Sequence, residues 1–176
     1  MEDETIVAKI NQAMDTFFQE DLWLVQKDLS ERSIAHRVAY HLTPLFEGLQ
    51  VDCEYNGDID NSTGKKMIHV LRDQLEALNL LRDNDPEEDN GIVSRSVFPD
   101  IIIHKRGDND NNLCAIEIKK SSSRIDFKYD QLKLQAYTSD ADGNLGYQLG
   151  VFLEIGVGLS SKHYHLGIFK DGIQIG

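Results

Sequence analysis

Three charged side chains stand in two apolar segments of the chain, and their types and spacing suit metal-dependent chemistry. Asp100 begins the run DIIIH, whereas Glu117 and Lys119 alternate with isoleucine in the run AIEIKK. Both runs are rich in branched residues that favour strands. The intervening KRGDNDNN has the glycine, aspartate and asparagine content of a hairpin connection. The sequence therefore predicts an antiparallel hairpin that carries all three side chains.

The register of this hairpin decides whether the two carboxylates meet. If His104 and Leu113 are the last paired residues, Asp100 lies directly opposite Glu117, with Cβ atoms about 4.5–5.5 Å apart. Side chains alternate between the two faces of a strand, so Lys119 shares the face of Glu117. Two carboxylates and an ammonium are therefore expected to converge on one face.

Two carboxylates this close repel each other unless a proton or a cation lies between them. Carboxylates with several waters are a usual ligand set for Mg²⁺. We therefore expect Asp100 and Glu117 to bind Mg²⁺, or Mn²⁺, with the backbone carbonyl of Ile118 as a further oxygen ligand. The ammonium of Lys119 would stabilise charge on a phosphate or orient an attacking water. This combination predicts phosphodiester hydrolysis.

Other segments are expected to position the hairpin within an α/β domain. Apolar residues at three- and four-residue spacing predict helices, and short branched or aromatic runs predict strands. Residues 58–96 are interpreted as a helical insertion between the first two core strands, and the acidic run DNDPEEDNG within it as a solvated loop. The order predicts one central mixed sheet flanked by helices. The predicted helices are 3–26, 30–42 (capped by Ser30), 65–82 and 125–139, and the predicted strands 49–55, 97–104, 112–120, 147–155 and 163–170.

The motif PD at 99–100, a hairpin, and EIK at 117–119 resemble the PD-(D/E)XK nuclease superfamily, which has the restriction-endonuclease-like fold. The resemblance covers roughly residues 30–155. The core of that family is a helix with an acidic residue, three strands, a helix and a final strand. Glu31 matches the acidic position of the first helix.

The resemblance implies a magnesium site formed by Asp100, Glu117 and Glu31, with Lys119 as a catalytic residue. Two alternatives stay open. An acidic residue in the first turn also complements the helix dipole, which would explain Glu31. Glu117 and Lys119 by themselves could be a solvent-facing charge pair on a strand.

The helix expected after the hairpin supplies the candidate substrate contacts. Asp130, Gln131 and Tyr137 resemble the Gln/Tyr-bearing helix of several nuclease branches, although Gln131 and Tyr137 are further apart than in the RecB-type Gln-x-x-x-Tyr pattern. We expect Lys128 and Gln131, with Lys120 from the strand, to contact substrate. The alternative for the helix is an ordinary polar face.

The charge of the chain limits how it can bind nucleic acid. Its 176 residues hold 18 Lys and Arg against 30 Asp and Glu, a net charge of −12. Such a chain repels polyanions unless a local basic patch offsets the field. Residues 119–133 hold five basic and two acidic residues, a local excess of 5 − 2 = +3. We therefore expect weak autonomous binding, to DNA more readily than to RNA, and a protein partner that delivers substrate.

A second hypothesis is a non-catalytic interaction or regulatory module that retains the nuclease fold and uses its acidic surface to bind a basic partner. For the nuclease, a homodimer is compatible with double-strand cleavage, with the N-terminal helix 1–26 or the leucine stripe of 65–82 as the interface.

The length predicts one domain, 1–176. No basic stretch precedes an apolar run and no apolar window approaches about 18 residues, so a cytoplasmic protein without a membrane partner is expected. Cys53 and Cys114 are both expected to be buried thiols.

Overall fold

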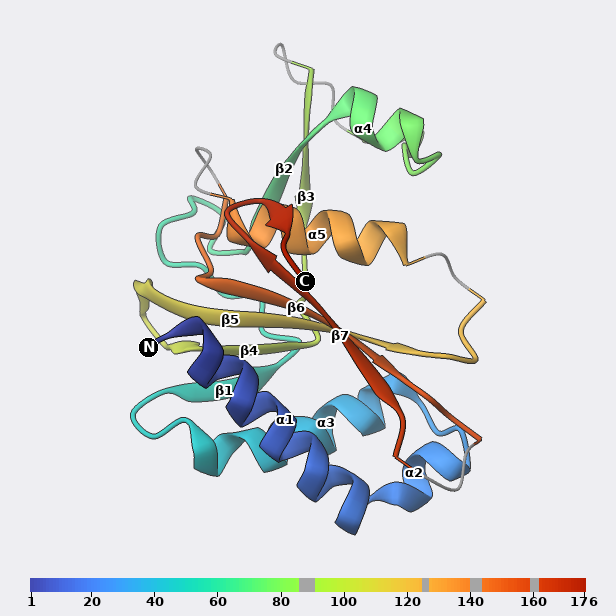
Figure 1. Ribbon diagram of the computed structural model, residues 1–176. Helices are drawn as coiled ribbons and strands as arrows, with labels where there is room; N and C mark the ends of the chain where they lie inside the picture. The colour runs from blue at the N-terminus through green and yellow to red at the C-terminus, as the bar shows by residue number, and fades with distance from the viewer. Residues whose placement is uncertain (86–90, 125–126, 140–143, 159–161) are drawn as a thin grey trace.

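A six-stranded sheet forms the middle layer of the fold, in the strand order β1-β4-β5-β6-β7-β8 (Figure 1). Neighbouring strands are antiparallel except β5 and β6, which are parallel and are connected in the chain by the crossover helix α5. The predicted α/β class with a mixed sheet flanked by helices is therefore confirmed. This computed structural model describes residues 1–85, 91–124, 127–139, 144–158 and 162–176.

The elements follow the chain in an order close to the predicted one. The helices are α1 (Asp3–Glu20), α2 (Leu22–Gln26), α3 (Glu31–Leu42), the 3₁₀ turn η1 (Thr43–Leu45), α4 (Arg72–Ala77) and α5 (Lys128–Thr138). The strands are β1 (Gln50–Cys53), β2 (Met67–Leu71), β3 (Ile92–Ser96), β4 (Ile101–Lys105), β5 (Asp108–Lys120), β6 (Leu149–Ile155), β7 (Tyr164–Lys170) and β8 (Ile173–Gln174).

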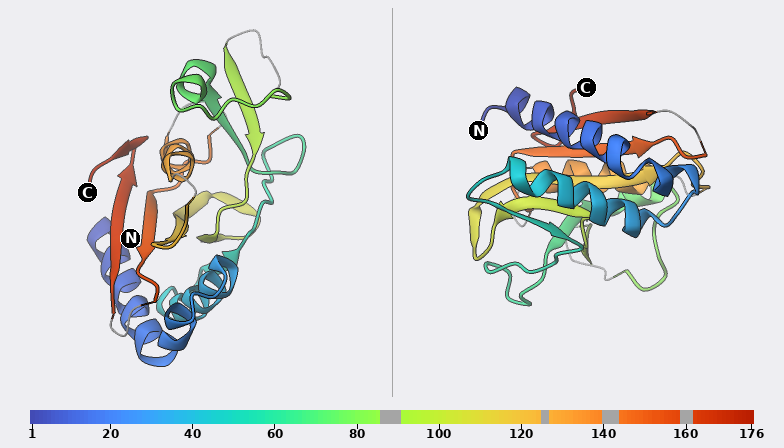
Figure 2. Two further views of the ribbon diagram at one scale, coloured as in Figure 1. Left: turned by 90° about the vertical axis from the view of Figure 1, so that its right-hand side faces the viewer. Right: turned by 90° about the horizontal axis from the view of Figure 1, so that it is seen from below.

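Helices cover both faces of the sheet and create two cores. The first three helices pack on one face and α5 on the other (Figure 2). Ile101 joins the core under α1 and α3, whereas its neighbour Ile102 joins the core under α5. Strands buried on both faces read as continuous apolar runs, which is why β4 begins with three consecutive isoleucines.

The N-terminal helix is not continuous, contrary to the prediction for 3–26. It ends at Glu20, and a short second helix starts at Leu22. The carboxylate of Asp21 at the break accepts a hydrogen bond from Arg37 Nε at 2.8 Å and lies 2.7 Å from His41 Nε2. The break therefore gives α3 a charged anchor. Helix α3 itself begins as predicted, with Ser30 Oγ accepting from the Ser33 N–H.

The insertion is not mainly helical, so the prediction of a helix over 65–82 is wrong. Strands β2 and β3 form a separate two-stranded antiparallel sheet, and α4 has only six residues. Ile68 and Val70 are both buried, which is the two-residue period of a strand. The acidic run is also not wholly solvated, because Asp85 accepts a hydrogen bond from buried Arg95 at 2.9 Å. Residues 86–90 of that run lie outside the described residues.

The β4–β5 hairpin is longer than predicted but keeps the register that matters. Ile101 pairs with Ile116 and Ile102 with Ala115, so one further step sets Asp100 opposite Glu117 as expected. Pairing does not stop at His104: it continues around the turn to Lys105 and Asp108, with irregularities on both sides of His104. Gly107 has φ +73° in this turn, a conformation that glycine adopts without a Cβ penalty. The irregularity lies near the turn, away from Asp100, Glu117 and Lys119.

Two surface predictions also change. Cys114 is buried, but Cys53 is exposed because it ends the edge strand β1. The apolar face of α1, including Ile10 and Phe17, is fully buried in the core of this chain and is not an open dimer interface. Among the described residues, no helix is both long and apolar enough to span a membrane.

Candidate functional site

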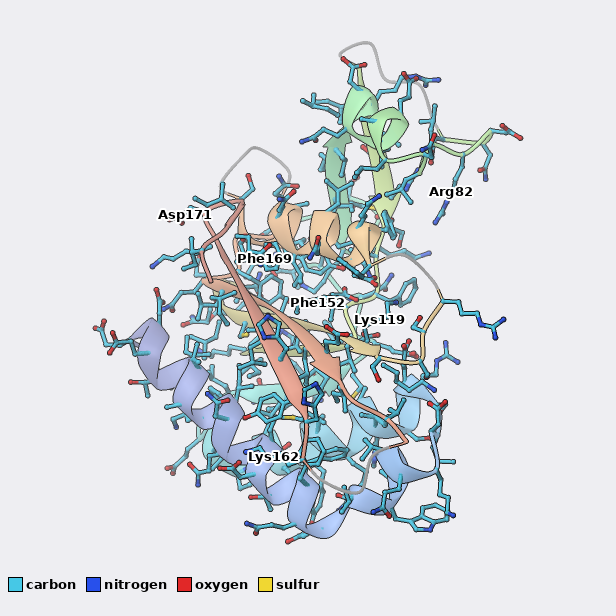
Figure 3. All side chains as sticks on the ribbon, turned by 45° about the vertical axis from the view of Figure 1, so that its right-hand side comes forward. Arg82, Lys119, Phe152, Lys162, Phe169 and Asp171 are labelled. Atoms are coloured by element: carbon cyan, nitrogen blue, oxygen red, sulfur yellow. The ribbon has the colours of Figure 1, made fainter. Side chains whose placement is uncertain are left out.

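The predicted hairpin residues gather at the carboxyl end of β5, beside the start of α5. The backbone N–H of Ile118 donates a hydrogen bond of 2.7 Å to Asp100 Oδ2, which ties the start of β4 to this end of β5. The side chains of Glu117 and Lys119 both form ion pairs with α5, whereas Ile118 packs in the opposite core. The alternation predicted from the sequence is therefore confirmed. Figure 3 shows Lys119 far from Asp171, which lies at the other end of the sheet.

Glu117 is the most buried member of this group. Its side chain is 2% exposed, and both oxygens have partners: Lys133 Nζ lies 2.7 Å from Oε2, and the Tyr137 hydroxyl donates to Oε1 at 3.0 Å. Burial raises the pKa of Glu117 to about 8 in spite of the adjacent Lys133 ammonium, and the Asp100 carboxylate adds to that rise. A proton or a cation at this position is therefore strongly favoured.

Asp130 joins the two lysines of the site. Its Oδ2 lies 2.7 Å from Lys119 Nζ, and its Oδ1 lies 2.9 Å from Lys133 Nζ. Burial by itself would lower the pKa of Lys119, but the hydrogen bond and the charge of Asp130 raise it above the ordinary value. Burial would likewise lower the pKa of Lys133, but Glu117 and Asp130 raise it. Both lysines therefore keep their protons at neutral pH.

Asp100 is half-buried directly before β4. Burial raises the pKa of its carboxyl, while the hydrogen bond from Ile118 N–H and the charge of Lys133 act in the opposite direction. Asp100 also borders a pocket of about 140 Å³. Arg32 and Glu54 form an exposed ion pair at that pocket, with Nε and Oε1 2.6 Å apart. The other residues lining the pocket are Ala35 and Cys53.

Glu31 reaches the same end of the sheet from the first turn of α3. Its Oε1 accepts a hydrogen bond of 3.1 Å from the backbone N–H of Lys120. Its charge also raises the pKa of the Asp100 carboxyl. The structure therefore brings Glu31 towards the predicted ligands, and does so through the last residue of β5.

We call Asp100, Glu117, Lys119, Asp130 and Lys133 the Glu117 cluster. With Glu31 beside it, four carboxyl groups face two ammonium groups, so this end of the sheet has an excess of acidic groups. Within the described ranges, no three His, Cys, Asp or Glu side chains gather closely enough to hold a metal ion by themselves. Mg²⁺ is usually held by one or two carboxylates and several waters, so Asp100 and Glu117 with the Ile118 carbonyl fit such a site chemically.

The predicted substrate contacts are spread more widely. Lys120 is not part of the cluster: its ammonium lies 2.8 Å from Asp28 Oδ1 and donates to the Leu29 carbonyl at 2.9 Å. It therefore holds the segment between α2 and α3 against the end of β5. Lys128 is exposed at the first residue of α5, and Gln131 is half-buried one residue after Asp130.

Sequence reasoning missed the part played by Lys133, and it named Asp130 and Tyr137 only through the family resemblance. These three residues are spaced by three and four along α5, so they lie on one helix face. That spacing was the available signal. It is weak because Leu132 and Leu134 between them are buried as well.

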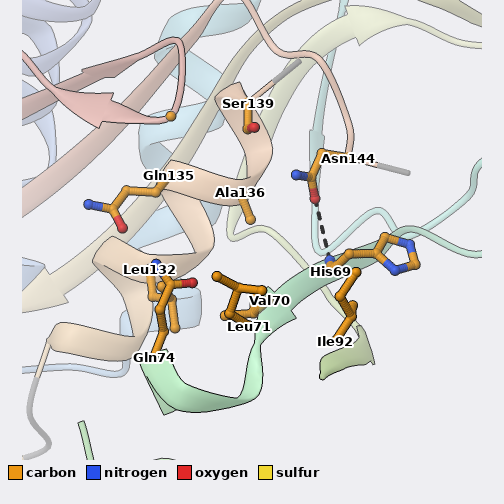
Figure 4. A pocket seen from close by; sticks show the side chains of 11 residues that line it. His69, Val70, Leu71, Gln74, Ile92, Leu132, Gln135, Ala136, Ser139 and Asn144 are labelled. Atoms are coloured by element: carbon orange, nitrogen blue, oxygen red, sulfur yellow. Dashed lines mark hydrogen bonds between the residues drawn. The ribbon is translucent and has the colours of Figure 1, made fainter. Parts of the chain in front are cut away.

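A second pocket lies on a different face of α5. It has a volume of about 340 Å³ and separates α5 from β2 and α4 (Figure 4). Leu132, Gln135 and Ala136 line it from α5, and the His69 N–H donates to Asn144 Oδ1 across its rim at 3.3 Å. The helix thus presents one face to the Glu117 cluster and another to the insertion.

A scan of this chain against protein-family models and searches of the curated proteins and of the solved structures found no match.

Proposed function

We propose that this protein is a magnesium-dependent nuclease that hydrolyses phosphodiester bonds of nucleic acid, with DNA as the preferred substrate. The observation that carries the proposal is the convergence of Asp100, Glu117 and Lys119 at one end of the sheet. An acidic pair able to hold a divalent cation lies next to an ammonium able to contact a phosphate. Glu117 and Lys119 lie on β5, and Asp100 directly precedes β4, which pairs with β5, and is bonded to the Ile118 N–H, so the arrangement is held by the sheet.

The order of the elements around the site supports the same proposal. Helix α3 with Glu31 is followed by β1, β4 and β5, then by α5 and β6. This succession agrees with the restriction-endonuclease-like core of a helix with an acidic residue, three strands, a helix and a final strand. In this chain the insertion between β1 and β4 is the β2–β3 sheet with α4.

Four residues of the Glu117 cluster have distinct parts in the proposed reaction. A bound Mg²⁺ supplies Lewis-acid stabilisation of the phosphate and a water of lowered pKa. Asp100 and Glu117 would hold it, with Mn²⁺ as an alternative ion. Lys119 stabilises the negative charge that develops on the phosphate or orients the attacking water. Asp130 is a positioning residue that fixes the ammonium of Lys119 at 2.7 Å.

A second candidate function is a non-catalytic binding module, and one observation favours it. Both oxygens of Glu117 are already satisfied by Lys133 and Tyr137, as in a purely structural ion network. In that case the acidic surface would bind a basic partner. A titration with Mg²⁺ separates the two functions. A metal site should bind millimolar Mg²⁺ saturably and lose this binding when Asp100 is replaced, whereas a purely structural network should show no saturable binding.

A panel of labelled single- and double-stranded DNA and RNA, with Mg²⁺ or Mn²⁺, tests the nuclease proposal directly. Wild type should cleave at least one substrate, and Asp100→Asn and Glu117→Gln should not. Lys170→Ala is a matched control. Lys170 is the last residue of β7 and pairs with Asp3, away from the Glu117 cluster, so it should be dispensable for cleavage. Cleavage by none of the wild-type combinations, or equal cleavage by Asp100→Asn, would refute the proposal.

A further inference from the structure

Two exposed phenylalanines stand close in the chain to residues of the Glu117 cluster. The side chain of Phe98 is 57% exposed, two residues before Asp100. Phe127 is 50% exposed, three residues before Asp130. Single exposed apolar side chains are common on protein surfaces, so it is the place of these two near the Glu117 cluster that makes them candidates for a ligand contact.

The contacts of the neighbouring residues place both rings at the same end of the sheet. Asp100 is bonded to the N–H of Ile118, so Phe98 lies within two residues of the carboxyl half of β5. The ring centroid of Phe127 is 5.8 Å from that of Phe152, which is the register partner of Glu117 on β6. In Figure 1 the end of β5 and the start of α5 accordingly lie on the same side of the molecule. Both phenylalanines therefore belong to the end of the sheet that carries the proposed reaction centre.

We propose that the preferred substrate is single-stranded nucleic acid, with unpaired bases stacked on Phe98 and Phe127 while the phosphate between them reaches Asp100, Glu117 and Lys119. This inference rests on the proposed nuclease function and adds the substrate class. Stacking of a base on an aromatic ring needs an unpaired base, since the bases of a duplex are already stacked on one another.

The charge of the chain favours the same substrate. Duplex binding relies on many phosphate contacts, and a chain with 30 acidic against 18 basic residues has no overall excess of positive charge to offer them. Lys128 follows Phe127 in the chain and is exposed, and Arg124 is exposed at the end of the preceding described segment, so a short stretch of backbone can be bound locally. Stacking adds affinity that does not depend on neutralising further phosphates. An acidic protein can therefore hold a single strand by two rings and a small basic rim.

Fluorescence anisotropy with a labelled 12-nucleotide oligothymidylate tests this proposal, using Ca²⁺ in place of Mg²⁺ so that binding is measured without cleavage. The variants are Phe98→Ala, Phe127→Ala and the corresponding leucines, which keep apolar surface but lack a π face. We expect each of the four to weaken binding by about 5- to 150-fold, the loss typical of one stacked base. Tyr40→Ala, at a residue 58% exposed on the outer side of α3, should bind as wild type does. A duplex of the same length should bind at least tenfold more weakly than the single strand.

Three outcomes would overturn the inference: full binding by the alanine variants, full binding by the leucine variants, or equal affinity for the duplex. Replacing Phe98 should leave the thermal midpoint nearly unchanged, whereas replacing Phe127 removes its contact with Phe152 and should lower the midpoint slightly. Binding is therefore measured well below the midpoint of each variant, with circular dichroism as the check of folding, which excludes misfolding as the cause of a loss. The experiment is independent of catalysis. Binding that depends on the phenylalanines without cleavage in Mg²⁺ would refute the nuclease proposal alone, whereas cleavage indifferent to Phe98 and Phe127 would refute the stacking alone.

Discussion

The ammonium of Lys133 lies 2.7 Å from Glu117 Oε2, which makes this lysine a direct competitor of any cation that binds Glu117. A second bond to Asp130, at 2.9 Å, keeps Lys133 within reach of the carboxylates if the first is broken. A divalent ion at Glu117 must therefore displace the ammonium from that oxygen. The displaced lysine would remain beside the substrate phosphate.

Replacing Lys133 by methionine should strengthen Mg²⁺ binding. The change removes a positive charge from the proposed ligand, and one unit charge a few ångströms away alters affinity by about tenfold or more even with strong screening. Isothermal titration calorimetry with Mg²⁺ measures this change. The apo variant should lose stability, because Glu117 is left buried without its charged partner, so its folding is checked by circular dichroism. Unchanged or weaker Mg²⁺ binding would show that Lys133 does not compete.

Replacing Asp100 by asparagine should keep or raise the thermal midpoint of the apo protein while removing the increase caused by Mg²⁺. Burial and the charges of Asp130 and Glu31 raise the pKa of Asp100, so its charged form is unfavourable in the apo state. The asparagine oxygen can still accept the hydrogen bond from Ile118 N–H. In wild type, Mg²⁺ at 100 times its Kd should add about 2.7 kcal/mol of stability. Thermal scans with and without Mg²⁺ test both statements, and a collapse of apo stability would indicate a structural role for Asp100.

The site was predictable from the sequence as far as local alternation determines it. Asp100, Glu117 and Lys119 stand on two strands whose pairing near them is regular, so the two-residue period was enough to place their side chains. The contribution of α5 to the site was harder to predict from the sequence. The contact between Lys133 and Glu117 depends on how the crossover helix sits on the sheet, and helical spacing gives only the face that the lysine shares with Tyr137.

The insertion was mispredicted because its apolar residues satisfy two periods at once. Ile68, Leu75 and Leu78 fit a helical stripe, yet Ile68 and Val70 also fit a strand, and the strand is formed because β3 pairs with it. The pairing partner lies more than twenty residues away, where no local pattern can reveal it. The ion pair of buried Arg95 was also missed, because its partner Asp85 belongs to a run that composition alone describes as solvated.

A buried lysine outside the site predicts how stability depends on pH. Lys66 is 1% exposed, and burial lowers its pKa although Asp58 acts in the opposite direction. At pH values between the folded-state and the unfolded-state pKa of Lys66, the unfolded chain binds more protons than the folded chain. The free energy of unfolding should therefore increase as the pH rises towards the ordinary lysine pKa of about 10.4. At neutral pH the unfavourable burial of the charge is fully present.

Lys66→Met should therefore stabilise the protein at pH 7 and flatten this alkaline rise. We expect a higher thermal midpoint at pH 7, where a gain of about 1 kcal/mol corresponds to about 2–4 °C for a chain of this size. Lys65→Met is the matched control, because its side chain is exposed and its replacement should change little. Thermal scans from pH 7 to 10.5 measure both variants. A lower midpoint at pH 7 would mean that the contact of Lys66 Nζ with the Tyr147 ring, 5.4 Å from its centroid, outweighs the cost of burial.

Lys119→Ala should abolish phosphodiester cleavage while leaving Mg²⁺ binding largely intact. A protonated lysine has no lone pair for a metal, so its contribution arises mainly in the transition state, as charge develops on the phosphate. Loss of one such donor typically lowers the rate by about 10²–10³-fold. Lys120→Ala is the neighbouring control: its ammonium is bonded to Asp28 and the Leu29 carbonyl, so the variant should lose some stability but retain most of its activity. Rates for both variants under single-turnover conditions, with Mg²⁺ affinity measured by calorimetry, test the distinction. Equal activity of wild type and Lys119→Ala would exclude the proposed role of Lys119, and equal losses in the two variants would reduce it to non-specific attraction of the phosphate backbone.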